Sequence, residues 1–282
     1  MDTSGLLYRA FFSLPTTLTA PDGTPTNAVY GTLRMLNRLV EDYHPDLAVL
    51  CFDEGRVTFR TQVYEEYKAQ RPEPPDELRP QFQIMREAGE ALGWPVFSKE
   101  GYEADDLIAT LARQGEERGD RVYIVTSDRD LLQLLSPRVS LLITKKGISE
   151  LEEITEEEFE AEWGFPPSRW VDYKALRGDP SDNIPGVRGV GEKTARRLIA
   201  RFGTVENLYQ HLDQVESARL RKALEEARDE VLVWKRLVTL DRQVEGVELP
   251  AEPVRDGFAS PRFHQFALRL GMKSLAQPQS LF

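Results

Sequence analysis

Short apolar runs alternate with predicted helices through the first half of the chain. The apolar runs predict buried strands at 47–52, 121–126 and 139–143, and a brief one at 96–97. The predicted helices lie at 28–43, 78–92, 104–118 and 130–135, after a short turn and helix over 2–14. Alternation of strands and helices is typical of α/β folds, so we expect a doubly wound, mostly parallel sheet flanked by helices.

The pattern turns helical after residue 150. Helices are predicted at 152–163, 172–176, 192–202, 204–212, 216–238 and 261–271, and a short polar tail at 276–282. Residues 56–80 are basic and aromatic and then rich in proline, which indicates an exposed excursion. We therefore expect an α/β core over 1–175 and a helical region over 176–282.

The composition excludes several kinds of site. The chain has a single cysteine, Cys51, inside an apolar run, and three scattered histidines, which excludes an intramolecular disulfide and a zinc site built from these residues. No apolar run approaches the roughly 18 residues of a membrane span, and no basic signal segment precedes the first motif. We expect a cytoplasmic, reducing setting, no membrane association and, without an assembly signature, a monomer.

The formal net charge of −11 would count against a nucleic-acid partner, but the charges are unevenly distributed. The interval 186–203 is strongly basic and holds a single acid, Glu192. A second basic group lies within 56–71. A basic surface around an acidic pocket is what a metal-dependent phosphodiesterase needs.

Carboxylates gather at predicted strand ends and in motif turns. They are Asp2, Asp53, Glu103, Asp105, Asp106, Asp128, Asp130, Asp179 and Asp182. In doubly wound sheets, sites form at the carboxyl ends of the strands. Oxygen ligands without His or Cys suit a hard cation such as Mg²⁺ or Mn²⁺. Two ions about 4 Å apart would neutralise the acids and serve phosphoryl transfer. Each acid alone can also be read as a turn or helix-cap residue.

The glycine-rich stretch 185–195 is a second candidate site. A phosphate-loop interpretation fails, because Glu192 occupies the position where lysine should follow the second glycine. We interpret the stretch as a glycine hairpin that feeds a basic helix and grips a DNA backbone phosphate. The candidate contacts are Gly186, Arg188, Gly189, Gly191, Lys193, Thr194, Arg196 and Arg197. A simple helix–loop–helix connection is the alternative.

Basic and aromatic residues interleave between 59 and 71. Phe59, Arg60, Tyr64 and Tyr67 precede the pair Lys68 and Arg71. This mixture suits single-stranded or frayed DNA, through stacking and phosphate pairing. Lys68 and Arg71 could also act as electrophiles on the scissile phosphate. An amphipathic, solvent-facing helix is the alternative.

With these motifs, the sequence resembles the 5′-nuclease (flap endonuclease) family, closest to the amino-terminal 5′–3′ exonuclease domain of bacterial DNA polymerase I. The matching segments are Asp2 with 8–11, 52–53, 67–71, 101–106, 126–130 and 178–186. The resemblance implies a PIN-like core with a helical arch at about 56–95. It also implies a helix-two-turn-helix DNA clamp at about 184–203, which in the family commonly holds a K⁺ ion.

The resemblance also implies roles for individual residues. The first metal site would be surrounded by Asp2, Asp53, Glu103, Asp105 and Asp106, and the second by Asp128, Asp130, Asp179 and Asp182. Lys68 and Arg71 would contact the scissile phosphate, with Tyr67 stacking near the 5′ end and Arg60 at the arch base.

The chain departs from the family at its start. The family usually has a hydrophobic strand before its first aspartate, whereas only Met1 precedes Asp2, and Thr3 replaces the usual glycine. That strand would be central to the sheet, so we expect a missing first strand and favour a natural product that starts earlier. For a chain that starts at Met1, we predict reduced stability and weaker binding at the first metal.

The leading functional interpretation is a structure-specific 5′-nuclease that uses two Mg²⁺ or Mn²⁺ ions in replication and repair. It would cut DNA near 5′ flaps, nicks or gaps, RNA-primed ends included, beside a DNA polymerase partner. The alternatives are a DNA-junction binding protein with impaired catalysis and a PIN-like ribonuclease.

Overall fold

Two short sheets form the centre of the described residues, which are 1–144, 151–253 and 257–276 of the computed structural model. β1 (Leu50–Cys51) pairs in parallel with β2 (Val96–Phe97). β3 (Val122–Thr126) pairs in parallel with β4 (Val139–Thr144), and β4 pairs antiparallel with β5 (Leu151–Ile154). The predicted mostly parallel sheet is confirmed, although its strand at 47–52 is shorter than expected.

Met1 and Asp2 lie in the gap between the two sheets. The Asp2 amide donates to the Val125 carbonyl at 3.0 Å, and the Cys51 amide donates to the Met1 carbonyl at 3.0 Å. The terminal amino group of Met1 donates to the Val49 carbonyl at 3.0 Å. These two residues therefore bridge the edges of the two sheets, with Met1 bonded to the β1 side and Asp2 to the β3 side.

A groove of about 560 Å³ continues this gap beyond Met1. It lies between the β1 edge and the β3 edge, and α2 (Asn27–Tyr43) and α5 (Ala104–Arg118) contribute apolar walls. Its lining includes Leu36, Leu39, Leu111, Ala112 and Val122. The position and the apolar walls of the groove would suit a buried parallel strand.

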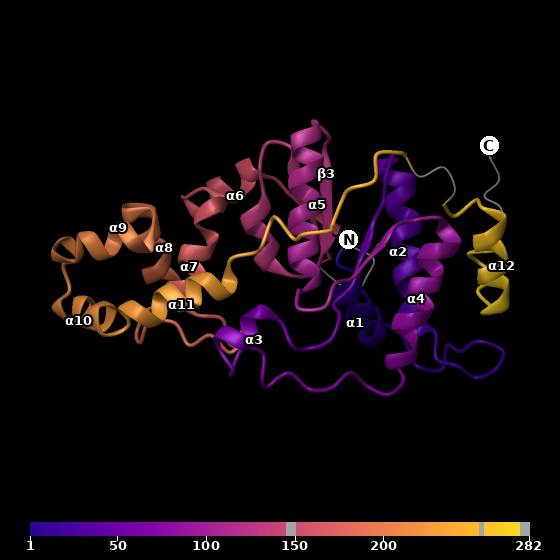
Figure 1. The fold of residues 1–282 in the computed structure, drawn as a ribbon, viewed down its shortest axis with the longest axis horizontal. Coiled ribbons are helices and arrows are strands. Elements are labelled where there is room, and N and C mark those ends of the chain that lie inside the picture. The colour runs from indigo at the N-terminus through magenta and orange to yellow at the C-terminus, as the bar shows by residue number, and fades with distance from the viewer. Residues whose placement is uncertain (145–150, 254–256, 277–282) are drawn as a thin grey trace.

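The remaining core helices cover the sheet on the side of the β1–β2 pair. α1 (Thr3–Ser13) packs against α2, and α4 (Arg79–Leu92) packs against both of them. α12 (Pro261–Arg269) packs against α4 through Phe263 and Phe266, which belong to the same apolar cluster as Leu6 and Met85. Helix 261–269 therefore belongs with the amino-terminal core, at the far end of the molecule from residues 192–238 (Figure 1).

The other end of the molecule is helical. α6 (Glu156–Trp163) is followed by α7 (Trp170–Arg177), α8 (Glu192–Phe202), α9 (Val205–Gln210), α10 (Ala218–Glu226) and α11 (Arg228–Val238). α7 packs against both α8 and α11, so it joins the sheet region to this helical end. Short 3₁₀ turns connect the elements: η1 (Arg129–Leu134), η2 (Pro167–Arg169), η3 (Pro180–Asp182) and η4 (Leu212–Gln214).

Two helix predictions were wrong in their extent. The segment predicted as one helix over 152–163 begins as β5, because Thr155 caps α6 by accepting the Glu158 amide. The predicted helix 216–238 divides into α10 and α11 at Ala227, which leaves helical geometry. Most of the tail predicted at 276–282 lies outside the described residues.

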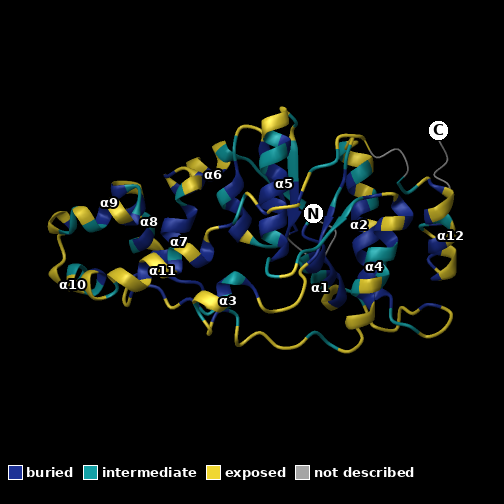
Figure 2. Ribbon diagram, viewed as in Figure 1, coloured by how far each residue is buried: buried dark blue, intermediate teal, exposed yellow. Residues whose placement is uncertain are grey.

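Residues 56–78 form α3 (Phe59–Val63) and a series of turns, with a long, largely exposed connection to α4 (Figure 2). α3 has only five residues, and the backbone folds down so that the Lys68 amide donates to the Asp182 carbonyl at 3.1 Å. This segment therefore closes on the acidic site. No helix in the described ranges is both long enough and apolar enough to cross a membrane.

Candidate metal centre

Acidic side chains line a cavity of about 520 Å³ at the carboxyl ends of β1 and β3. The sheet places Asp53 just after β1 and Asp128 just after β3, while Asp105 comes from the first turn of α5. The other acids that line the cavity are Asp2, Glu103, Asp130, Asp179 and Glu192. Seven of the nine predicted carboxylates thus share one cavity.

Asp2 is held by polar contacts from α1 and β3. The Thr126 hydroxyl donates to its Oδ2 at 2.8 Å, and the Gly5 amide donates to its Oδ1 at 2.8 Å. A Cβ on Gly5 would lie 2.3 Å from the same carboxylate, so only glycine fits there. Burial and the neighbouring Asp53 raise the pKa of Asp2 to about 6.

Four acids, Asp2, Asp53, Asp105 and Asp128, form no ion pair with any described residue; we call them the uncompensated group. Burial, then Asp128 and Asp2, raise the pKa of Asp105 well above its usual range. Backbone amides hold two others: Ala104 donates to Asp53 Oδ1 at 2.9 Å, and Asp130 donates to Asp128 Oδ1 at 2.8 Å. The site therefore concentrates negative charge that only a cation or bound protons can offset.

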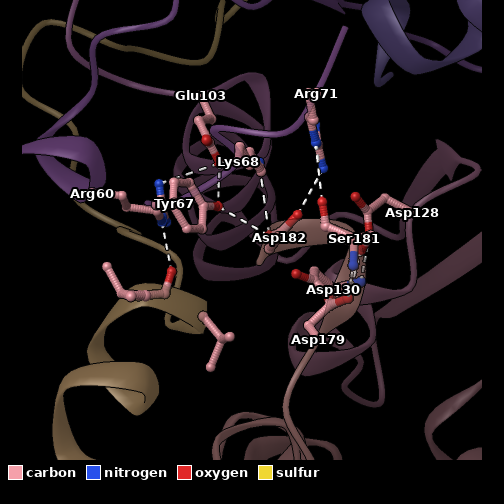
Figure 3. A network of polar contacts seen from close by, with 12 residues as sticks. Arg60, Tyr67, Lys68, Arg71, Glu103, Asp128, Asp130, Asp179, Ser181 and Asp182 are labelled. Carbon is pink, nitrogen blue, oxygen red and sulfur yellow. Dashed lines mark hydrogen bonds and ion pairs between the residues drawn. The ribbon is translucent and has the colours of Figure 1, made fainter. Parts of the chain in front are cut away.

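The compensated group consists of Glu103, Asp130, Asp179 and Asp182, each of which contacts a protein cation. Lys68 Nζ lies 2.9 Å from Glu103, and Arg71 lies 2.7 Å from Asp182. Figure 3 shows these two cations and the Tyr67 hydroxyl converging on the two carboxylates. Burial would raise the pKa of Glu103, but Lys68 and Arg60 outweigh it and lower that pKa.

Lys174 completes the compensated group and was not predicted. Its ammonium donates to Asp130 Oδ1 and Asp179 Oδ2 inside the protein. Burial, then Asp128, raise the pKa of Asp130 to about 7 in spite of Lys174. For Asp179, Lys174 outweighs burial and lowers the pKa. Lys174 lies one helical turn after Trp170 on a buried face, and a lysine at such a position was the signal that could have revealed it.

Oxygen atoms of Asp130, Asp179 and Asp182 lie within 4.8 Å of one another, a spacing that could hold an ion. The cavity lining offers carboxylate and hydroxyl oxygens and no His or Cys, and carboxylate oxygen is the ligand type that Mg²⁺ and Mn²⁺ prefer. The residues present therefore fit hard divalent cations.

Asp106 and Arg60 are placed elsewhere than expected. Arg60 is 1% exposed and donates to both carboxylate oxygens of Asp106, at 2.7 Å each. It also donates to the Leu237 carbonyl, and Asp106 accepts the Asp241 amide, so the pair ties α5 to the end of α11 and to the segment after it. Neither residue lines the cavity, and we no longer assign Asp106 to the metals or Arg60 to DNA.

Tyr67 also differs from the expected DNA-stacking residue. It is 4% exposed, and its hydroxyl lies 3.2 Å from Glu103 and 3.1 Å from Asp182. Because the Tyr67 ring is buried and its hydroxyl is hydrogen-bonded inside the protein, the ring belongs to the core in this conformation. It does not face a ligand.

The predicted clamp divides into exposed and buried positions. Arg188, Lys193 and Arg197 are exposed, as are Gly189 and Gly191, where α8 begins. Thr194 is half-buried in the first turn of α8.

Arg196 and Gly186 make contacts within the protein and are not placed to bind DNA. Arg196 donates to the Trp163 carbonyl at 2.9 Å and covers the ring of the same residue. Gly186 has φ +69°, and a Cβ there would lie 2.4 Å from the backbone of Arg177 and Gly178. These two residues hold the clamp against α6 and α7.

The comparisons with known proteins agree with this geometry. The family model for the 5′-3′ exonuclease N-terminal resolvase-like domain matches residues 1–164, and that for the 5′-3′ exonuclease C-terminal SAM fold matches residues 165–256. The chain is 43% identical over 254 residues to DNA polymerase I of Bacillus caldotenax, covering 90% of this chain and 29% of that protein. It therefore spans less than a third of that relative.

Solved structures show the same fold. Bacteriophage T5 5′-exonuclease with bound zinc has a TM-score of 0.70 at 22% identity, covering 98% of each chain. A bacteriophage T5 flap endonuclease in complex with DNA and metal ions has a TM-score of 0.69 at 21% identity, covering 96% of this chain and 93% of that one. The chain belongs to the 5′-3′ exonuclease family, with a resolvase-like α/β domain and a C-terminal SAM fold.

Proposed function

We propose that this protein is a structure-specific 5′-nuclease that hydrolyses DNA phosphodiesters near 5′ flaps, nicks and gaps with the help of two divalent metal ions. The observation that carries the proposal is the cavity that the uncompensated group shares with Glu103, Asp130 and Asp179, while an oxygen of Asp182 lies within 4.8 Å of those of Asp130 and Asp179. Such a concentration of carboxylates is unfavourable without cations. The described lining includes serines but no histidine or cysteine, so it offers no Ser–His or Cys–His pair for nucleophilic catalysis.

Bound Mg²⁺ or Mn²⁺ would supply a water nucleophile at neutral pH and stabilise charge on the transferring phosphoryl group. Asp2, Asp53, Asp105 and Asp128 would hold one ion, and Asp130, Asp179 and Asp182 the other. Lys68 and Arg71 lie at the rim of the same cavity, and they would contact the scissile phosphate once DNA competes for them. The residues around the site thus orient substrate and metal, and none is asked to form a covalent bond.

The exposed clamp supports a DNA substrate. Arg188, Lys193 and Arg197 stand at the start of α8, where free backbone amides add to their charge. Because Glu192 lines the cavity, the clamp and the acidic site are contiguous, so one duplex could reach both. We infer that the clamp reads backbone and not sequence; a K⁺ ion there remains part of the proposal.

The polymerase connection is also a proposal. Since the matched relative is a DNA polymerase I of which the chain covers 29%, we propose that this nuclease works beside a polymerase in replication and repair. RNA-primed 5′ ends fit the same site.

A labelled 5′-flap duplex tests the proposal. With Mg²⁺, wild-type protein should release the flap, and Asp128→Ala should cut at least about 10³-fold more slowly while still binding the duplex. Asp42→Ala, an exposed acid on α2, is the matched control and should cut normally. Equal cleavage by Asp128→Ala would discredit the site.

The same assay separates the alternatives. Binding of the flap without cleavage by wild-type protein would support a junction-binding protein. Preferred cleavage of an all-RNA strand would support a ribonuclease. The contacts that hold Asp2 in place favour an active nuclease over a junction-binding protein with impaired catalysis.

A further inference from the structure

Lys174 occupies the position where the compensated carboxylates would accept a metal ion. Its ammonium is buried and donates to Asp130 and Asp179, two of the three acids whose oxygens group within 4.8 Å. Neither the motifs nor the proposed metal sets include this lysine. Its place inside the cluster calls for a role of its own.

Hydrogen bonds already occupy most of the oxygens in this trio. Asp179 accepts the Ser181 amide and hydroxyl on Oδ1, at 2.8 and 2.6 Å, and Lys174 on Oδ2. Asp182 accepts Arg71 on Oδ1 and the Tyr67 hydroxyl on Oδ2. In the part of the chain that the structure describes, Asp130 Oδ2 has no such partner. A divalent ion that bridges Asp130 and Asp179 would have to compete with Lys174 for the same oxygens.

We propose that Lys174 is a resident cation that holds the Asp130–Asp179 pair until a divalent ion displaces it, and so sets the affinity of that position. The inference rests on the proposed metal-dependent function. A lysine suits the role because its ammonium is a compact charge on a flexible stem, which can withdraw without moving α7. Two cations at one pair of carboxylates repel each other strongly in a poorly hydrated site. Lys174 is thus a positioning residue that acts through its carboxylate partners.

The test measures Mn²⁺ binding to the whole, DNA-free protein. Calorimetry and the electron paramagnetic resonance signal of free Mn²⁺ are the two methods of measurement. Lys174→Met removes the competing charge and should tighten the weaker Mn²⁺ site about tenfold. Lys174→Gln, which can still donate to a carboxylate, should tighten it as well and guards against misfolding of the first variant. Lys174→Arg keeps the charge and should bind Mn²⁺ as wild type does.

A second readout is thermal stability. Without metal, Lys174→Met should melt below wild type, because two buried carboxylates lose their cation, and Mn²⁺ should raise its melting temperature more than it raises that of wild type. Lys235→Met is the control: Lys235 pairs with buried Asp172 at 2.7 Å, outside the cavity, so this change should lower stability without altering Mn²⁺ affinity.

Equal or weaker Mn²⁺ binding by both uncharged variants would overturn the role of Lys174 and leave the metal-dependent function standing. Absence of Mn²⁺ binding in wild type and variants alike would overturn both. Tighter binding by Lys174→Arg would also contradict the proposal, since the competing charge is still there.

Discussion

The two groups of acids in and beside the cavity differ in what balances their charge. Glu103, Asp130, Asp179 and Asp182 contact Lys68, Arg71 or Lys174, whereas Asp2, Asp53, Asp105 and Asp128 contact no cation among the described residues. Two acids at the start of α5 show the difference most clearly. The pKa of Asp105 lies far above its usual range, whereas the pKa of Glu103 lies below its usual value.

The difference suggests a division of labour. Among the compensated acids, Glu103 and Asp179 have pKa values that their cations lower, so these two can stabilise the metal-free fold. Asp2 and Asp105, whose pKa values burial and neighbouring acids raise, oppose folding when ionised, and under the proposed function a metal ion would offset their charge. A site of this kind exchanges stability of the metal-free state for affinity for the ion.

The largest expected effect comes from removing the cation of a buried acid outside the cavity, Asp106, which is paired with Arg60 as the compensated acids are paired with their cations. Arg60→Met leaves Asp106 buried without its cation and should lower the free energy of unfolding by about 3–5 kcal/mol, measured by urea denaturation in EDTA. The double change Arg60→Met with Asp106→Leu should recover much of the loss, because no buried charge remains. A loss below 1 kcal/mol for the single change would show that this pair does not anchor α5.

The neighbours at the start of α5 give a matched test of sign. In EDTA at pH 8, Glu103→Gln should destabilise by about 1–3 kcal/mol, since it removes the partner of Lys68 at 2.9 Å. Asp105→Asn should instead stabilise by about 1 kcal/mol, because it removes a carboxylate whose ionisation burial and Asp128 oppose. Changes of the same sign in both variants would remove the distinction between the groups.

The sequence was informative about this site where the position of an acid follows from the strand before it. Asp53, Asp128 and Asp130 follow apolar runs, so their positions at strand ends could be predicted from the pattern alone. The pairings could not. Asp106 and Asp105 are adjacent and chemically alike, and only the packing of Arg60 from residues far away in the chain decides that Asp106 points away from the cavity. Lys174 and Arg196 were misjudged or missed for the same reason: a charged residue on a helix looks solvent-facing until its neighbours are known.

Two acids with raised pKa values, Asp2 of the uncompensated group and Asp130 of the compensated group, also predict how stability depends on pH. The pKa values of Asp2, at about 6, and Asp130, at about 7, exceed those of the unfolded chain, so the folded state keeps protons that the unfolded state loses. The contribution of these two acids to stability in EDTA is therefore full below about pH 4 and should fall between pH 4.5 and 7, on the order of 1 kcal/mol per pH unit. Thermal or urea unfolding across this range measures the slope.

Two comparisons make the pH result specific. Asp2→Asn should reduce the slope, because one of the titrating groups is gone. Saturating Mg²⁺ should flatten it, because an ion offsets the charges that form as pH rises. Stability that rises through this window in EDTA would contradict the raised pKa values.

The smallest effect concerns how Asp2 is held. It sits at the end of a two-residue segment between β1 and β3, and Met1 lines the apolar groove between these strands. An extension of about five Val, Leu or Ile residues ahead of Met1 should enter as a parallel strand and raise the melting temperature by about 5 °C. The alternation of hydrogen bonds fixes the expected register: the residue before Met1 should protect the Val125 amide from exchange, while the Leu50 amide, already bonded to the Pro95 carbonyl, should not change. A Gly/Ser extension of equal length is the control, and equal melting temperatures and Mg²⁺-dependent cleavage for the two extensions would mean that the charge of Asp2, and not its support, limits the first metal site.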